Sequence, residues 1–219
     1  MKQYVIFGDS AFAERIYRYI QCEGIHRVLC FTNEKEFIVK DKIENLEIIP
    51  FEYLSEQYDK ESFEILICIG YAQMNRLREK IYNLCKKSGY RIGTWISSAA
   101  ISYSEDIAEG SLIMPGVLIG PTTRIGVCNI IASRVCISHD SVIGDFNFIS
   151  SSVVFGGFSN VQTHSFIGLN ATIKDGVTIK DFSLIGLASN VLKSTETKGV
   201  YVGNPARKLE NRNSLETKI

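Results

Sequence analysis

Two adjacent side chains, His139 and Asp140 in the segment ISHDSV, have the types needed to move a proton near neutral pH. A neutral imidazole has a reference pKa of about 6.5 and can remove a proton from an amine or a hydroxyl, and such base catalysis typically contributes about 10² to 10⁴ in rate. A carboxylate beside the ring can fix its tautomer and stabilise the imidazolium, and either Asp140 or Asp145 could do so. The alternative is a histidine that only packs at a surface or an interface.

The element that carries His139 is predicted by a six-residue period that begins at Ile101. A bulky apolar residue stands at every sixth position, without an insertion, as far as Val191. Such a period marks a parallel β-helix, in which each hexapeptide supplies a short strand and a corner, and three hexapeptides complete a triangular coil of eighteen residues. Each residue then stacks on the residue eighteen positions later, about 4.8 Å away. We expect the glycines and small residues between the apolar positions to form the corners.

The period also predicts where the two histidines of the coil point. His139 lies outside the inward column, so its ring is expected to point outward, and Gly157, one coil later, would leave space beside the ring for a slender ligand. His164 has Phe146 and Phe182 as its neighbours eighteen residues away, so it is expected to complete an outer aromatic stack. We therefore favour His139 as the catalytic residue. The third histidine lies outside the coil, no other ligand is suitably spaced for zinc, and we expect no metal.

The first 96 residues follow a different pattern, in which short apolar runs alternate with amphipathic helical stretches. We predict strands at 4–8, 27–32 and 65–70 and helices at 10–21 and 74–89, the second with Met74, Leu77, Ile81 and Leu84 on one stripe and Gly89 as its cap. This alternation predicts an α/β domain with a parallel, Rossmann-like sheet. The chain then divides into a βαβ domain at 1–96, a β-helix at 97–196, and a C-terminal loop and tail at 197–219. We expect the polar end ENRNSLETKI to be poorly ordered.

Composition excludes some partners and suggests others. The 24 basic and 24 acidic side chains leave no overall field to attract nucleic acid or an anionic membrane. No apolar run approaches the roughly 20 residues that span a bilayer. The six cysteines include no CxxC pair and the chain start is not a secretory apolar stretch, so we expect a cytoplasmic protein. Few charges occur between residues 111 and 173, so we expect a symmetric homo-oligomer to cover that surface, and a three-sided prism suits a trimer.

Three segments, ISHDSVIGD, GVYVGNPARKL and CIGYAQMNRLREKIY, resemble the sugar acyltransferases grouped with the sialic acid O-acetyltransferases. The resemblance covers nearly the whole chain and implies a left-handed β-helix, which is a known exception to the right-handed crossover rule. It also implies a homotrimer with active sites between subunits and acetyl-CoA as cosubstrate. Relatives in this group N-acetylate nucleotide-linked 4-amino-4,6-dideoxy sugars. The resemblance thus implies that reaction here, with His139 as general base and Asp140 as its acidic neighbour.

The same resemblance assigns binding residues. Acetyl-CoA would run along an outer groove with its adenine end near the GNPAR loop, and the residues implied are Gly157, Gly168, Asn170, Gly186, Gly203, Pro205 and Arg207. The nucleotide-linked sugar would bind where the N-terminal strands end, at Gly8, Ser10, Asn33, Glu34, Gly70 and Tyr71. A purely structural turn is the alternative at each of these six positions. Phe148 stands where some relatives have a second histidine, whose role backbone amides or Asn147 would have to take over.

Two other functions stay open. A sugar O-acetyltransferase that acts on sialic acid or a similar sugar would use the same residues, although a nucleotide-binding domain favours the N-acetyltransferase. A non-catalytic scaffold built from a β-helix and a βαβ domain would bind no acetyl-CoA and would tolerate His139→Ala.

Overall fold

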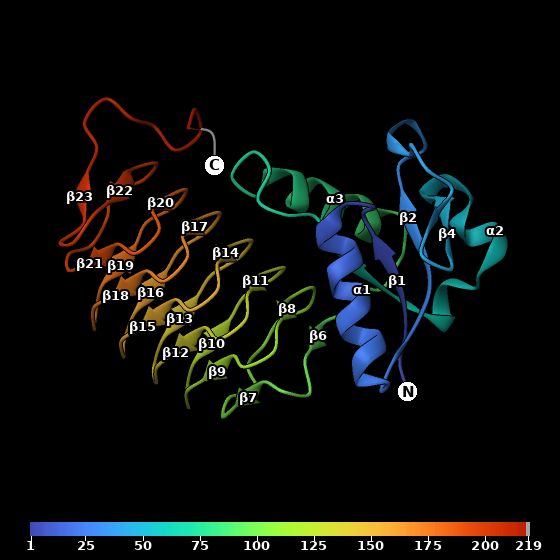
Figure 1. The fold of residues 1–219 in the computed structure, drawn as a ribbon, viewed down its shortest axis with the longest axis horizontal. Helices are drawn as coiled ribbons and strands as arrows, with labels where there is room; N and C mark the ends of the chain where they lie inside the picture. Colours follow the sequence, from blue (N-terminus) through green and yellow to red (C-terminus); the bar gives the residue numbers. More distant parts are fainter. Residues whose placement is uncertain (218–219) are drawn as a thin grey trace.

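The computed structural model describes residues 1–217, and its N-terminal part is a five-stranded sheet with a helix on each face (Figure 1). The strands are β1 (Gln3–Phe7), β2 (Arg27–Asn33), β3 (Lys42–Ile43), β4 (Leu46–Pro50) and β5 (Glu64–Ile67), in the order β3-β4-β2-β1-β5. All neighbours are parallel except β3 and β4. The Rossmann-like sheet is therefore confirmed, whereas β3 and β4 were not predicted, because no helical pattern separates them from β2.

Two helices cover this sheet. α1 (Ala11–Glu23) begins after the N-cap Ser10 and ends at Gly24 in the left-handed conformation, and α3 (Arg76–Lys87) lies on the opposite face. The predicted start of the second helix at Met74 is wrong, because Gln73 and Met74 have φ values of 54° and 50° and cannot continue a helix. The remaining short helices are α2 (Leu54–Gln57), η1 (Lys35–Phe37), η2 (Phe51–Tyr53) and η3 (Lys60–Ser62).

From Trp95 onward the chain winds into a coil with three faces (Figure 1). The face next to α1, which we call the seam face, contains β6 (Trp95–Ile96), β8 (Leu112–Ile113), β11 (Ile130–Ile131), β14 (Phe148–Ile149), β17 (Phe166–Ile167), β20 (Leu184–Ile185), β22 (Val200–Val202) and β23 (Arg207–Lys208). The second face contains β7 (Ile101–Ser102), β9 (Leu118–Ile119), β12 (Cys136–Ile137), β15 (Val154–Phe155), β18 (Thr172–Ile173) and β21 (Asn190–Val191). The third face contains β10 (Arg124–Ile125), β13 (Val142–Ile143), β16 (Asn160–Val161) and β19 (Thr178–Ile179).

The strand register confirms the eighteen-residue coil. Ile131 pairs with Ile113 on one side and with Ile149 on the other, and the apolar column from Ile113 to Val191 forms one buried core. The first coil is one residue shorter, because Ile101 pairs with Leu118 and Ile96 pairs with Ile113, each seventeen residues away. A one-residue shift turns a strand side chain to the other face, and Ile101 is 56% exposed. The inward position predicted for Ile101 is therefore wrong.

The corners between the strands contain both glycines and residues in the left-handed conformation. The glycine that follows several of the apolar residues is required by close approach between coils, since a Cβ at Gly120 would lie 2.6 Å from the backbone nitrogen of His139. The left-handed conformation occurs two residues after that glycine position, at side chains as large as Arg134 and Phe146. The glycines and small residues thus lie in the corners as expected, and the left-handed positions between them also accept large side chains.

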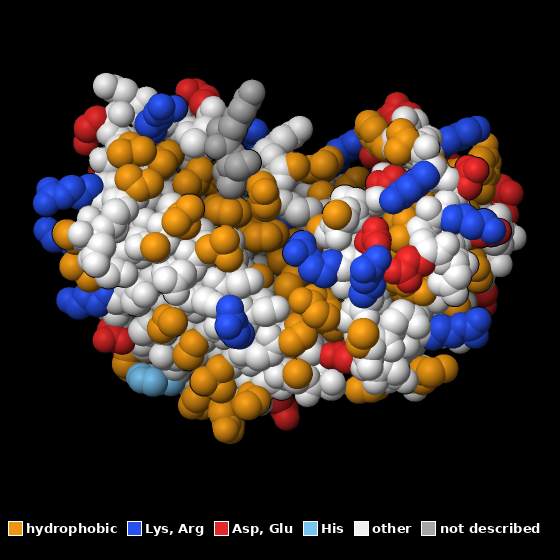
Figure 2. All heavy atoms as spheres, viewed as in Figure 1, with side chains coloured by type: hydrophobic (Ala, Val, Ile, Leu, Met, Phe, Trp, Pro, Cys, Tyr) orange, Lys and Arg blue, Asp and Glu red, His pale blue; other side chains and the backbone are white. Residues whose placement is uncertain are grey.

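The two domains meet along a continuous apolar seam (Figure 2). Trp95 and Ile130 of the coil pack in one cluster with α1, and Met74 packs against the other end of the seam face. The tail returns to this seam, where Ser214 is fully buried and Leu215 packs with Met74. The expectation of a poorly ordered tail is therefore wrong for Ser214 and Leu215, while 218–219 lie outside the described residues.

Candidate active site

His139 stands at a corner of the coil between β12 and β13, and its partner is the adjacent carboxylate. The imidazole Nδ1 lies 2.8 Å from Oδ2 of Asp140, and the ring is about half exposed. The hydroxyl of Thr122 donates to the other carboxylate oxygen, Oδ1, at 2.6 Å. This hydroxyl, followed by the imidazole, holds the pKa of Asp140 below its usual value. An ionised Asp140 favours the tautomer with a proton on Nδ1, which leaves Nε2 of His139 as the basic nitrogen.

The neighbours of His139 repeat with the coil period. Thr122, Asp140 and Phe158 are eighteen residues apart, and all three have positive φ, near 60°, 55° and 58°. The ring of Phe158 meets the imidazole of His139 edge to face, with centroids 5.3 Å apart. Thr122 and Phe158 were not predicted as site residues, although their spacing from Asp140 in the sequence would have identified them.

The space next to His139 differs from the prediction. A Cβ at Gly157 would lie 2.7 Å from Cε1 of His139, so the imidazole itself lies over this glycine. The notch expected to admit a ligand is therefore filled by the ring. Asp145 is directed elsewhere, because its Oδ1 accepts a hydrogen bond from the backbone nitrogen of Val127 at 2.7 Å. Asp140 is thus the carboxylate that contacts His139.

His164 has the packing role predicted for it. Its ring is stacked between Phe146 and Phe182, with centroid distances of 5.3 and 4.8 Å. The side chain is almost fully buried under α3, where Nε2 lies 3.1 Å from Oε2 of Glu79. His164 therefore joins the two domains rather than forming an open site.

The residues implied for cofactor binding lie on two different edges of the prism. Gly157 lies at the edge between the second and third faces, beside His139. Gly168 and Gly186 lie at the edge between the seam face and the second face, where they line a cavity between the domains, and the exposed Asn170 follows on the same edge. Another two, Pro205 and Arg207, line a separate cavity at the C-terminal end of the coil together with Lys193 and Lys208. Gly203 precedes them in the β22–β23 turn.

The residues implied for sugar binding also fall into two groups, one at the ends of β1 and β2 and one after β5. At the end of β1, Gly8 has a φ of 120°, and a Cβ there would lie 2.9 Å from the oxygen of Cys68, so this position requires glycine. At the end of β2, Asn33 donates to Oδ1 of Asp9 at 3.0 Å, and Glu34 lies 3.4 Å from Lys80. Asp9 was not predicted, although it stands between Gly8 and the cap Ser10.

After β5, the segment with Gly70 and Tyr71 turns toward the coil instead. The carbonyl of Gly70 accepts a hydrogen bond from Arg78 at 2.7 Å. The ring of Tyr71 meets Phe148 and Phe166 edge to face at 5.1 and 5.0 Å. Tyr71 therefore lies on the seam, where it packs against the coil. Within residues 1–217, no helix is long and apolar enough to cross a membrane, and no three His, Cys, Asp or Glu side chains are grouped to hold a metal ion.

Comparison with known proteins identifies the fold. No protein-family model matches the chain, and no curated protein matches its sequence. The acetyltransferase domain of PglB from Neisseria gonorrhoeae FA1090 superposes with a TM-score of 0.84 and 18% identity, over 95% of this chain and 100% of that one. A variant of perosamine N-acetyltransferase from Caulobacter crescentus, in complex with CoA and GDP-perosamine, superposes with a TM-score of 0.83 and 20% identity, over 96% of this chain and 98% of that one. WeeI from Acinetobacter baumannii AYE superposes with a TM-score of 0.83 and 22% identity, over 95% of this chain and 100% of that one. The chain thus has the α/β-plus-left-handed-β-helix fold of these proteins.

Proposed function

We propose that this protein is an acetyl-CoA-dependent N-acetyltransferase that acts on the 4-amino group of a nucleotide-linked 4-amino-4,6-dideoxy sugar. The observation that carries the proposal is the half-exposed imidazole of His139, whose Nδ1 is held by Asp140 at 2.8 Å so that Nε2 is the basic nitrogen. Two structures of the same fold support it, since the perosamine N-acetyltransferase is bound to CoA and GDP-perosamine and the PglB domain to acetyl coenzyme A.

In the proposed reaction, Nε2 of His139 takes a proton from the sugar amine as the nitrogen attacks the thioester carbonyl. The carbon–nitrogen bond forms, the tetrahedral intermediate collapses, and the carbon–sulfur bond breaks. The imidazolium then returns the proton to the CoA thiolate, so the base is regenerated. Asp140 stabilises the imidazolium between these steps and keeps the ring in the productive tautomer.

We further propose a homotrimer with active sites between subunits. Gly157 and His139 lie on one edge of the prism, whereas Gly168 and Gly186 lie on another, so one chain alone does not place all four along one groove. A neighbouring subunit would bring the two kinds of edge together. The large exposed ring of Phe158 and the low charge of the coil surface are consistent with such contacts.

For the ligands, we propose the binding residues that the fold makes available. The CoA phosphates would bind near Arg207, in the cavity that also contains Lys193 and Lys208. The nucleotide would bind at the carboxyl ends of β1 and β2, next to the N-terminus of α1, where backbone N–H groups favour a phosphate.

The proposal is tested by measuring CoA release from acetyl-CoA with UDP-, dTDP- and GDP-linked 4-amino-4,6-dideoxy sugars, with sialic acid for comparison. We expect turnover with one of the amino sugars, and a loss of about 10² to 10⁴ in kcat for His139→Asn with acetyl-CoA affinity kept. His26→Asn, in the other domain, is the matched control and should retain full activity. Acetylation of sialic acid alone would indicate the O-acetyltransferase, and absence of acetyl-CoA binding would indicate the scaffold.

A further inference from the structure

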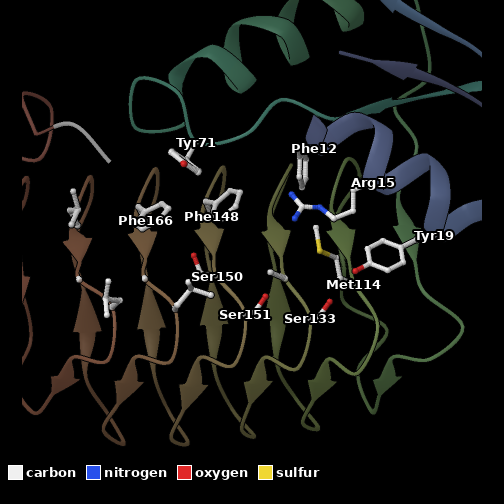
Figure 3. Close-up of a pocket in the computed structure, with 16 residues that line it drawn as sticks. Phe12, Arg15, Tyr19, Tyr71, Met114, Ser133, Phe148, Ser150, Ser151 and Phe166 are labelled. Atoms are coloured by element: carbon white, nitrogen blue, oxygen red, sulfur yellow. The ribbon is translucent and has the colours of Figure 1, made fainter. Parts of the chain in front are cut away.

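The seam between the two domains contains a cavity of about 450 Å³, bounded by α1 on one side and by the seam face on the other (Figure 3). The outward column of the seam face is apolar throughout, and its members are Leu112, Ile130, Phe148, Phe166, Leu184 and Val200. α1 and Trp95 cover the N-terminal end of this column, and Met74 and Leu215 cover the C-terminal end. The cavity lies between these two covers, beside Phe148 and Phe166.

Aromatic rings form the wall of the cavity. Phe148 and Phe166 are stacked nearly parallel, with centroids 5.5 Å apart and an interplanar angle of 12°. Tyr71 meets both rings edge to face, and Figure 3 shows it above them, while Phe12 approaches from α1 with its centroid 6.4 Å from that of Phe148. A centroid spacing of 5.5 Å leaves no room for a flat base between the two stacked rings. The wall therefore suits an aliphatic group better than a nucleobase.

The polar groups of the lining also narrow the choice of ligand. No carboxylate and no side-chain amide is among the described residues that line the cavity. Its one charged side chain is Arg15, whose guanidinium lies 5.6 Å from the centroid of Phe12, and the serines Ser133, Ser150 and Ser151 lie along the coil side. A sugar with a protonated amine would meet a cation here and no carboxylate, which is unfavourable. The lining thus favours an uncharged apolar group over an amino-sugar acceptor.

Two of the lining residues connect this cavity to the proposed cofactor. Gly168 and Gly186, which the resemblance implies for acetyl-CoA binding, line its edge together with Leu169 and Leu187. Cavities of about 300 to 1,000 Å³ hold whole drug-sized ligands, so an acetyl group with three non-hydrogen atoms would leave most of this space empty. The fit is better for a longer chain on the same thioester.

We propose that this cavity is an acyl pocket that admits CoA thioesters with straight aliphatic chains longer than acetyl, and that Phe148 and Phe166 determine the accepted chain length. The inference rests on the proposed function, since it requires the thioester to reach the edge with Gly168 and Gly186. The chemistry is unchanged: the carbon–sulfur bond of the acyl-CoA breaks, the amide bond forms, and His139 passes the amine proton to the CoA thiolate.

The test compares acetyl-, butyryl-, hexanoyl- and succinyl-CoA by calorimetry with the full-length protein. Each buried methylene is expected to tighten binding about fourfold, so butyryl-CoA should bind about tenfold or more tightly than acetyl-CoA. Phe148→Trp and Phe166→Trp extend into the cavity and should reduce this butyryl-to-acetyl ratio at least fivefold. Phe37→Trp, at an exposed phenylalanine of the other domain, is the matched control and should keep the ratio.

The outcomes separate this inference from the proposed function. Turnover of acetyl-CoA with equal affinity for acetyl- and butyryl-CoA would overturn the acyl pocket and leave the N-acetyltransferase intact. Tighter binding of succinyl- than of butyryl-CoA would show that Arg15 makes this an anion site, and competition between the acceptor sugar and the butyryl chain would show an acceptor site. Either result rejects the acyl pocket. If no CoA thioester binds at all, both proposals fail.

Discussion

The guanidinium Nη2 of Arg78 lies 3.0 Å from the backbone oxygen of Asn147, and this hydrogen bond joins α3 to a corner of the coil. The fully buried Arg78 also donates to the backbone oxygens of Cys128 and Gly70 and to Oδ1 of Asn75. None of the ion pairs in residues 1–217 includes it, and burial lowers the pKa of Arg78 to about 10, so it remains a cation at neutral pH. The contact between the domains thus includes a buried charge whose hydrogen-bond acceptors are all neutral oxygens.

Replacing Arg78 is expected to be strongly destabilising. Arg78→Met leaves several buried carbonyls without a donor, and the expected loss is about 3 to 5 kcal/mol in the free energy of unfolding. Arg78→Lys should recover only a small part, because one ammonium cannot reach acceptors on both domains. Urea denaturation measures the change, and Arg76→Met, at an exposed position in the same turn, should stay within about 0.5 kcal/mol of the parent. Equal stabilities of the two methionine variants would contradict this role of Arg78.

The carboxylate of Asp140 is expected to control the tautomer of His139. In Asp140→Asn the amide no longer favours a proton on Nδ1, and kcat should fall by about 10² to 10⁴ while acetyl-CoA affinity changes little. Thr122→Val keeps the carboxylate and removes the hydroxyl that most lowers its pKa. The pKa of Asp140, followed by carboxyl NMR titration, should therefore rise in Thr122→Val, and an unchanged titration would count against this hydrogen bond.

Adjacent glycines give a matched pair of substitutions at the site. The φ of Gly157 lies outside the left-handed region, and a Cβ there would lie 2.7 Å from Cε1 of His139, which can rotate away. We expect Gly157→Ala to lower kcat at least tenfold through displacement of the ring, with a stability loss below about 1 kcal/mol. A Cβ at Gly156 would lie 2.6 Å from the backbone nitrogen of Asp175, which cannot move without disrupting the coil. Gly156→Ala should therefore cost mainly stability, and the reverse pattern would disprove this assignment.

The buried His164 is expected to make stability depend on pH. Burial lowers the pKa of His164, although Glu79 acts in the opposite direction. Below about pH 6.5, His164 therefore takes up a proton more readily in the unfolded chain than in the folded chain. The free energy of unfolding has its full value above that pH and decreases as the pH falls toward the lower, folded-state pKa. The slope should reach at most about 1.4 kcal/mol per pH unit. Urea midpoints between pH 7 and 5 should show a smaller slope for His164→Gln, with His26→Gln as the control that keeps it.

Much of the fold could be predicted because its repeat is written directly in the sequence. A strict period of six is compatible with one regular fold, the three-sided coil, and the register of Ile113, Ile131 and Ile149 follows from it. The period cannot show where the repeat loses phase, and Ile101 was placed inward for that reason. The apolar stripe of α3 packs against the sheet as predicted, at Leu77, Ile81 and Leu84. The burial of Arg78 and Cys85 beside this stripe was not predicted.

The site was predictable where its chemistry is local in sequence. His139 and Asp140 are adjacent, so their contact needs little tertiary information, and the fold brings Thr122 and Phe158 to them through the coil period. The cavity on the seam face could not be predicted, because it depends on how two domains pack. The contact of Leu215 in the tail with this seam could not be predicted either, because it depends on the same packing. The polar residues around Leu215 in the sequence do not indicate such a contact.

Each side chain of the coil stacks on another side chain one full turn away. This stacking restricts where the coil can gain or lose residues. A single inserted residue near Ile149 would move every later inward side chain out of phase, whereas removal of one complete turn would return each column to register. We therefore expect related coils to differ in length by whole turns of eighteen residues. The seventeen-residue step at Ile101 lies in the outermost layer, where a lost phase disturbs nothing beyond it.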